Sequence, residues 1–234
     1  NSKHHFKIGG EFVGRINENR DVLENISSEK NEKLTAAYAE HTWYFIKRWG
    51  LKTGIRAEHS DFVEEWNISP RISLAYKPSK YHNFSIFYGE FFQSPLEEIG
   101  YFNPTGFMKS KQYLINYFYQ KDKQIIRLEL YQKDYEDLVR NDGNFNFIQN
   151  GNGYARGIDV FWRNRGSHIK NLEYWISYSY IDTKRLYKDF PEKAQPAFVA
   201  NHNLSFVGKY WIQDWRSQIG LTYQFNSGRP YSEI

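Results

Sequence analysis

Residues 154–185 read YARGIDVFWRNRGSHIKNLEYWISYSYIDTKR, and apolar side chains occupy every second position on both sides of the break RGSHIKN. Before the break, Ile158, Val160 and Trp162 alternate with small or charged residues; after it, residues 172–180 do the same. A period of two residues is that of a β-strand with one apolar and one polar face. The stretch therefore predicts two strands. In a soluble sheet the apolar face packs on a core, whereas in a membrane barrel it meets lipid and the polar face lines a wet lumen.

The composition of the whole chain fits strands that are apolar on one side only. Aromatic residues make up 19% of the 234 residues, but hydrophobic residues make up only 40%. The sequence contains no apolar run of 18 residues, so no transmembrane helix is predicted, and the opening NSKHHFKIGG lacks the apolar core of a signal peptide. Cysteine is absent, which excludes disulfides and thiolate chemistry. The 31 basic residues are interleaved with 27 acidic ones, so the charge pattern does not indicate nucleic-acid binding.

The connections between the predicted strands alternate in length. Tight connections at 48–50, KPSKYH, QKDK, RGSHIKN and IQDW alternate with long ones at 18–32, 60–67, 94–109, NDGNFNFIQNG and LYKDFPEKAQP. Up-and-down strands that cross a slab produce this rhythm, and the Greek-key crossings of a sandwich do not. The predicted strands number about eleven, at residues 5–17, 33–48, 50–59, 68–77, 83–93, 110–119, 124–140, 152–164, 170–184, 197–211 and 215–227.

The faces of most strands follow from parity. One face carries uncharged, mainly apolar residues, as in Ile72, Leu74 and Tyr76, while the opposite face carries polar ones such as Arg71 and Ser73. The strand from Leu34 to Ile46 is the exception, because Glu40 and Thr42 blur its alternation, and its faces stay unassigned.

Aromatic residues recur at both ends of the predicted strands, as in the interfacial girdles of membrane barrels. Their high β-propensity offers a simpler explanation, but their recurrence beside nearly every tight turn favours a girdle. One ring lies near the tight turns, at Trp43, Tyr44, Trp49, Tyr76, Tyr81, Tyr117, Tyr119, Trp162, Tyr174, Tyr210, Trp211 and Trp215. The second lies near the long loops, at Tyr88, Tyr113, Tyr154, Tyr178, Tyr180 and Phe225.

The order and spacing of several stretches resemble a known family. SPRISLAYKPSKYHNFSIFYGEFFQSP, LELYQKDYEDLVR, GNGYARGIDVFWRN, WISYSYIDTKR, ANHNLSFVGKYW and SGRPY, within residues 68–231, resemble the C-terminal half of the 22-stranded barrel of the TonB-dependent outer-membrane receptors. The resemblance implies an all-β, antiparallel, up-and-down transmembrane β-barrel fragment with about 11 of 22 strands. Residues 1–234 would then be part of one barrel domain.

The resemblance also implies a location and partners. It implies a bacterial outer-membrane protein that contacts outer-membrane lipid and actively imports a scarce solute, such as an iron-siderophore, cobalamin or a glycan fragment. In the family, an N-terminal plug fills the barrel and is pulled by TonB. The sequence departs from this pattern, since no plug, no TonB-contacting segment and no terminal strand ending in an aromatic residue is found in it. Transport is therefore expected only of the complete receptor.

No pattern for catalysis, cofactor binding or metal binding emerges from the sequence. The seven histidines lack metal-ligand spacing, and no GxSxG elbow is present. Asp134, Glu136 and Asp137 resemble a pair of catalytic carboxylates, but a solvated and mutually paired rim explains them better. Gly151, Gly153 and Gly157 precede a strand rather than the helix that a phosphate loop requires.

Two sets of residues are candidates for the functional surface. Aromatic residues of the long loops could stack on a ligand or on each other: Trp66, Phe102, Phe107, Phe145, Phe147 and Tyr187. Charged residues of the polar face would line the lumen, where they contact a plug or pair with neighbouring wall residues: Arg127, Glu129, Asp159, Arg163, Lys209 and Arg216. A secreted or surface all-β glycan-binding module, with its apolar face buried as a core, remains the alternative. An outer-membrane enzyme is less well supported, because no catalytic constellation is present.

Overall fold

The computed structural model describes residues 3–21, 26–95, 106–141 and 147–230. Its elements are β1 (His4–Asp21), β2 (Ile26–Ile46), β3 (Trp49–Ser60), β4 (Glu65–Tyr76), β5 (His82–Gln93), β6 (Met108–Lys121), β7 (Gln124–Asn141), β8 (Phe147–Arg165), β9 (Leu172–Leu186), β10 (His202–Ile212) and β11 (Ser217–Asn226). The described part of the chain contains no helix long and apolar enough to cross a membrane.

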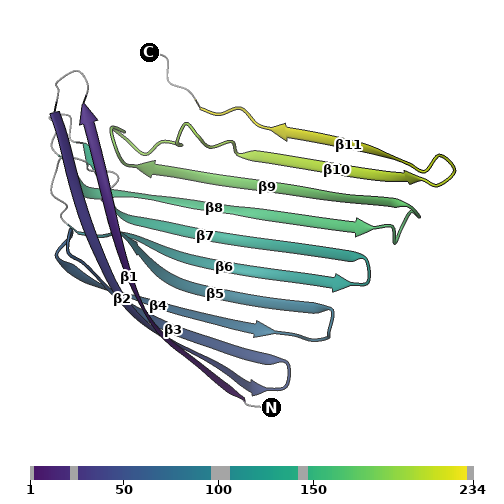
Figure 1. The fold of residues 1–234 in the computed structure, drawn as a ribbon, viewed down its shortest axis with the longest axis horizontal. Helices are drawn as coiled ribbons and strands as arrows, with labels where there is room; N and C mark the ends of the chain where they lie inside the picture. Colours follow the sequence, from purple (N-terminus) through teal and green to yellow (C-terminus); the bar gives the residue numbers. More distant parts are fainter. Residues whose placement is uncertain (1–2, 22–25, 96–105, 142–146, 231–234) are drawn as a thin grey trace.

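All of these strands belong to one antiparallel sheet, in which their spatial order is their sequence order. Tight turns lie along one end of the strands and long connections along the other, as Figure 1 shows. The outermost strands are β1 and β11, and no pairing between them closes the sheet. The predicted up-and-down all-β fragment is confirmed.

The register of β5 to β8 places apolar residues in continuous rows across the sheet. Ile86 pairs with Ile115, which pairs with Leu130, which pairs with Ile158. These four side chains are 42–55% exposed although they are large and apolar. Single exposed apolar residues are normal on a protein surface, but whole rows of them mark a surface made to meet another apolar phase. We call this the outward face; the opposite, polar side is the inner wall.

The structure resolves the faces of β2, which the sequence left open. Ala37 and Ala39 lie on the outward side, opposite Gly10 and Ile8 of β1. Glu40 therefore lies on the inner wall, where it forms an ion pair with Lys52 at 3.0 Å. The small outward alanines explain why the alternation of hydrophobicity is weak in this strand.

Two strand boundaries differ from the predictions. The long connection predicted at 18–32 is largely strand, because β1 and β2 stay paired until Asp21 and Ile26. Conversely, β10 begins at His202 rather than near residue 197. The preceding segment instead follows β9, with two backbone hydrogen bonds between Arg185 and Ala194.

Candidate functional site

The inner wall of β1 to β3 is a surface of paired charges. Arg56 lies between Glu11 and Glu58, at 2.8 and 2.6 Å. The carboxylate of Glu32 is buried, and it accepts hydrogen bonds from Arg15 at 3.3 Å and from Ser60 at 2.5 Å. Arg15 and Arg56 thus have carboxylate partners, whereas Lys7 of β1 lies 5.3 Å from the centroid of the Tyr38 ring and has no carboxylate within ion-pair distance among the described residues.

The inner wall of β4 to β10 is built differently, because most of its cations lie over aromatic rings. The distances from the charged group to the ring centroid are 4.7 Å for Arg71 over Phe91, 5.4 Å for Arg127 over Phe118, 5.4 Å for Lys133 over Tyr131, 4.4 Å for Arg185 over Tyr135 and 5.4 Å for Lys209 over Trp175. Within the described residues, none of these five cations has a carboxylate within ion-pair distance. A ring face attracts a cation without neutralising it.

The predicted lumen-wall residues share the inner wall, with one correction. Glu129 and Asp159 pair in register on β7 and β8, and Asp159 accepts a hydrogen bond from Ser179. Arg163 forms an ion pair with Glu173, which is the neighbouring-wall pairing that the sequence left open. Arg127 and Lys209 lie over rings as described above. Arg216 is not on the wall, because it lies in the turn between β10 and β11 with a φ of 47°.

A small pocket opens at the loop end of β5, β6, β7 and β9. Its volume is about 280 Å³, and we call it the rim pocket. Its polar lining comes from Arg185, Lys109, Ser110 and amide side chains, and no carboxylate side chain lines it. Arg185 approaches the ring of Tyr135 at 4.4 Å and that of Tyr187 at 5.9 Å, and its buried Nε has no hydrogen-bond partner within the described residues. The lining residues are Phe91, Phe92, Gln93, Met108, Lys109, Ser110, Gln112, Tyr135, Leu138, Val139, Arg185 and Tyr187.

Of the six predicted loop aromatics, Tyr187 is the one that lines the rim pocket. Trp66 is not a loop residue: it lies in β4, 69% exposed and 5.0 Å from the ring of His59. Phe107 is not exposed, because it is buried edge-on against Phe92. Phe147 is the first residue of β8. Phe102 and Phe145 lie outside the described residues.

Arg185 and Tyr135 are the residues of this pocket that the sequence did not single out. They are 50 positions apart in the sequence, and β8 lies between their strands, β7 and β9, in the sheet. The signal was present in part, because both lie on the polar parity of their strands close to a long connection. Only the register of β7, β8 and β9 brings them together.

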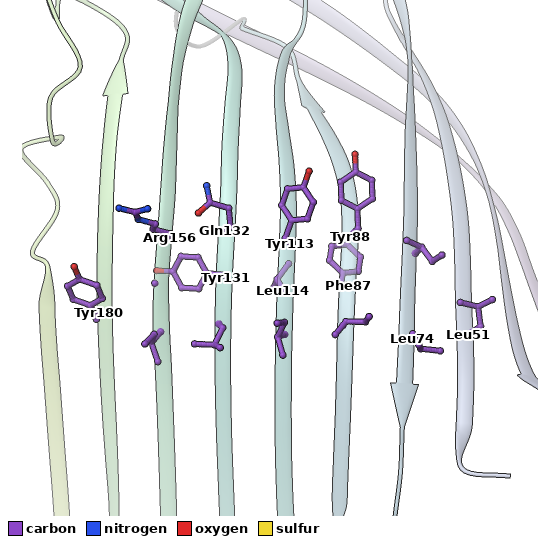
Figure 2. Close-up of a pocket in the computed structure, with 16 residues that line it drawn as sticks. Leu51, Leu74, Phe87, Tyr88, Tyr113, Leu114, Tyr131, Gln132, Arg156 and Tyr180 are labelled. Carbon is purple, nitrogen blue, oxygen red and sulfur yellow. The ribbon is translucent and has the colours of Figure 1, made fainter. Parts of the chain in front are cut away.

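A larger hollow, about 860 Å³, lies over the apolar rows rather than over the rim pocket. Ile86, Ile115 and Leu130 contribute to its lining, and these are outward residues. In Figure 2, the Tyr88 and Tyr113 rings stand side by side with their hydroxyl groups toward the loop end of the strands. A tyrosine whose ring lies on an apolar surface and whose hydroxyl points toward the strand end is typical of an interfacial aromatic girdle. The hollow therefore belongs to the outward face of the sheet.

Within the described residues, no group of three or more His, Asp or Glu side chains is placed to hold a metal ion. Nδ1 of His4 lies 3.0 Å from Nε2 of His41, and the two rings stack with centroids 5.2 Å apart.

Comparisons with known proteins agree with this architecture. The model of the family described as "TonB dependent receptor-like, beta-barrel" matches residues 4–233. A search of curated proteins found no match.

Several solved structures share the fold. The outer membrane transporter YddB from Escherichia coli has a TM-score of 0.74 at 11% identity, covering 97% of this chain and 40% of its own. The ferric-catecholate import receptor Fiu from Escherichia coli has a TM-score of 0.73 at 13% identity, and the match covers 96% of this chain and 42% of Fiu. The FrpB iron transporter from Neisseria meningitidis has a TM-score of 0.65 at 16% identity, and the match covers 83% of this chain and 33% of FrpB. The chain thus spans less than half the length of these structures.

Proposed function

Because the chain belongs to the family of TonB-dependent receptor β-barrels, we propose that it forms about half of the barrel of a receptor that actively imports a scarce solute across the outer membrane. The observation that carries the proposal is the two-sided sheet. Its outward face presents apolar rows to lipid, and its inner wall presents charged and hydrogen-bonding groups to the lumen.

The proposed solute is an iron-siderophore, with cobalamin or a glycan fragment as the other members of the class. Two of the similar structures are named as an iron transporter and a ferric-catecholate import receptor, which favours iron chelates. The rim pocket is the proposed first contact for the solute, since it lies at the loop end and combines rings with hydrogen-bonding side chains. In the complete receptor, a plug would fill the lumen and TonB would act on that plug.

The alternative of a soluble glycan-binding module does not fit the sheet. Such a module would bury its apolar face under a second layer, but the outward face here carries Ile8 at 81% and Leu221 at 63% exposure. The described residues form a single sheet. The family is one of receptors and transporters, and no enzymatic role is proposed.

Uptake of radiolabelled iron tests the proposal directly. Cells that carry the complete receptor should accumulate iron from at least one ferric siderophore, and they should lose this uptake when either the receptor or TonB is deleted. Iron uptake that is the same in all three strains, across hydroxamate, catecholate and carboxylate siderophores, would count against iron chelates as the solute. Cobalamin and glycan uptake would be measured next in the same strains.

A further inference from the structure

The cations of the inner wall fall into two sectors that present different charge to the lumen. On β1 to β3, Arg56 and Lys52 have carboxylate partners at 2.6–3.0 Å, and Lys7 is the exception, because it lies over the Tyr38 ring at 5.3 Å. On β4 to β10, the five cations Arg71, Arg127, Lys133, Arg185 and Lys209 lie over rings instead. A carboxylate cancels the charge of its partner, whereas an aromatic ring holds the side chain in place and leaves the charge to act on whatever enters the lumen.

The unpaired cations also form a series along the lumen axis. Arg185 lies near the loop end of β9, Lys133 and Arg71 lie near the middle of their strands, and Arg127 and Lys209 lie close to the tight turns. These positions run from the side where a solute would enter to the side where it would leave. A single binding site would concentrate cations at one depth of the lumen, whereas a path would distribute them along its length.

Few acids are available in this sector to balance these charges. Glu129 and Asp159 lie side by side on β7 and β8, and neither has a cation within ion-pair distance among the described residues. Glu173 is already paired with Arg163 at 2.5 Å and approaches Arg165 at 3.4 Å. Glu65, at the loop end of β4, also has no ion pair among the described residues, so the five ring-seated cations still outnumber these three carboxylates.

We propose that the solute of this receptor is an anion, and that the ring-seated cations of β4 to β10 form its path along the lumen wall. The inference rests on the proposed uptake function and narrows its solute class. Cations spaced along a wall attract an anion at every depth, but each contact is weak enough to release it to the next, as conduction through a selective pore requires. Because the rings hold the long side chains in place, little side-chain entropy is lost when the anion binds.

Two chelates of similar size and different charge test the inference on the complete receptor in detergent. The ferric tris-catecholate complex is a trianion, and the ferric trihydroxamate complex is neutral. Their affinities would be measured by quenching of tryptophan fluorescence at low and high salt. The trianion should bind more tightly than the neutral chelate, and its affinity should fall as salt rises.

Variants locate the effect. Arg71→Gln, Lys133→Gln and Arg185→Gln should each weaken binding of the trianion by about tenfold, the loss expected for one charge-assisted contact of about 1.4 kcal/mol. Lys52→Gln is the matched control: it removes one inner-wall cation that Glu40 already neutralises, and it should leave the affinity unchanged.

Three results would overturn the inference. Equal affinity for the two chelates would mean that charge does not select the solute, and the uptake function would still stand. Unchanged trianion affinity in the three variants, together with a lower melting temperature, would assign these cations to contacts with the plug. Binding of neither chelate would also reject the inference, and the cell uptake assay would then judge the proposed function independently.

Discussion

A cation placed in the centre of the outward face should destabilise the folded barrel strongly. Ile115 is the best position for this test, because it is 55% exposed and lies in the apolar row between Ile86 and Leu130. An arginine at the bilayer midplane of a membrane barrel costs about 2–4 kcal/mol. This cost corresponds to a shift of roughly 30- to 900-fold in the folding equilibrium. At an exposed position of a water-soluble sheet, the same change would cost less than about 0.5 kcal/mol.

The cost of an outward arginine should also depend on its depth in the membrane. Tyr113 is the next outward residue of β6 toward the loop end, and a step of two residues along a tilted strand changes depth by about 5 Å. Tyr113→Arg should therefore cost less than Ile115→Arg, about 1–2 kcal/mol, because the cost falls from the midplane toward the interface. The following outward residue, Lys111, is already a cation and forms an ion pair with Glu136 at 2.6 Å.

Asn116→Arg is the matched control on the inner wall. Asn116 follows Ile115 directly but lies on the other side of the sheet, opposite Glu129 in register. A cation there gains a carboxylate neighbour in a wet lumen, so we expect no loss of stability.

The three variants of the receptor would be folded into lipid vesicles and unfolded with guanidinium, with tryptophan fluorescence as the readout. The transition midpoint should fall most for Ile115→Arg, less for Tyr113→Arg and not at all for Asn116→Arg. The assignment of lipid-facing and lumen-facing sides would be refuted by equal shifts for Ile115→Arg and Asn116→Arg. A loss for Tyr113→Arg as large as that for Ile115→Arg would refute the assigned depth.

Two further pairs of variants test the packing of the inner wall, with the heat-induced shift in electrophoretic mobility of the folded barrel as the measurement. Gly157→Ala should cost about 1–3 kcal/mol, because an added Cβ would overlap the Tyr131 ring and neighbouring backbone, whereas Gly14→Ala, which meets open space, should cost less than about 0.5 kcal/mol. Glu32→Ala should cost about 1–3 kcal/mol, mainly because it leaves the buried Ser60 hydroxyl without its acceptor, while the Arg15 guanidinium is exposed enough to be solvated. Glu40→Ala removes a partly exposed pair and should cost less than about 1 kcal/mol. Equal losses within either pair would contradict the burial and contacts described.

Parity predicted the sheet well where the outward side chains are large. In β5 to β8, residues such as Ile86 and Leu130 are bulky and apolar, and their neighbours are polar, so alternation alone identifies both faces. It failed in β2, where Ala37 and Ala39 contribute little hydrophobicity and Glu40 dominates the pattern. Register with β1 and β3 supplies the missing information, and register is a property of strand pairs rather than of one strand.

The connections were harder to predict than the strands, because backbone pairing does not require apolar residues. The polar stretch predicted as a loop at 18–32 is largely strand, held by the ladder that joins β1 to β2. The burial of Phe107 and the strand position of Trp66 were also missed. Whether an aromatic ring near a strand end is free or packed depends on neighbours from other strands, and these neighbours are distant in the sequence.

The rim pocket shows what sequence reasoning needs in order to find such a site. Arg185 of β9 supplies a positive charge of the pocket, and Tyr135 of β7 supplies the ring nearest to that charge. β8 lies between these two strands. Both residues lie in stretches that resemble the family, but nothing in either stretch brings the two together, so the pocket follows only from pairing the three strands in their observed register. The same holds for every cation of the β4 to β10 wall, because its ring partner is identified by register and parity together.

The division of the inner wall has a consequence for how the barrel responds to salt. On β1 to β3, Lys52 has Glu40 at 3.0 Å, so the two charges of this pair largely cancel each other before salt screens them. The ring-seated cations of β4 to β10 keep their field at low salt and lose its reach as the Debye length falls toward about 8 Å near physiological salt. Attraction of an anion should therefore be strongest along β4 to β10, and it should weaken there as salt rises. The proposed path of the solute thus follows from where the wall places most of its ring-seated cations, on β4 to β10, and most of its ion pairs, on β1 to β3.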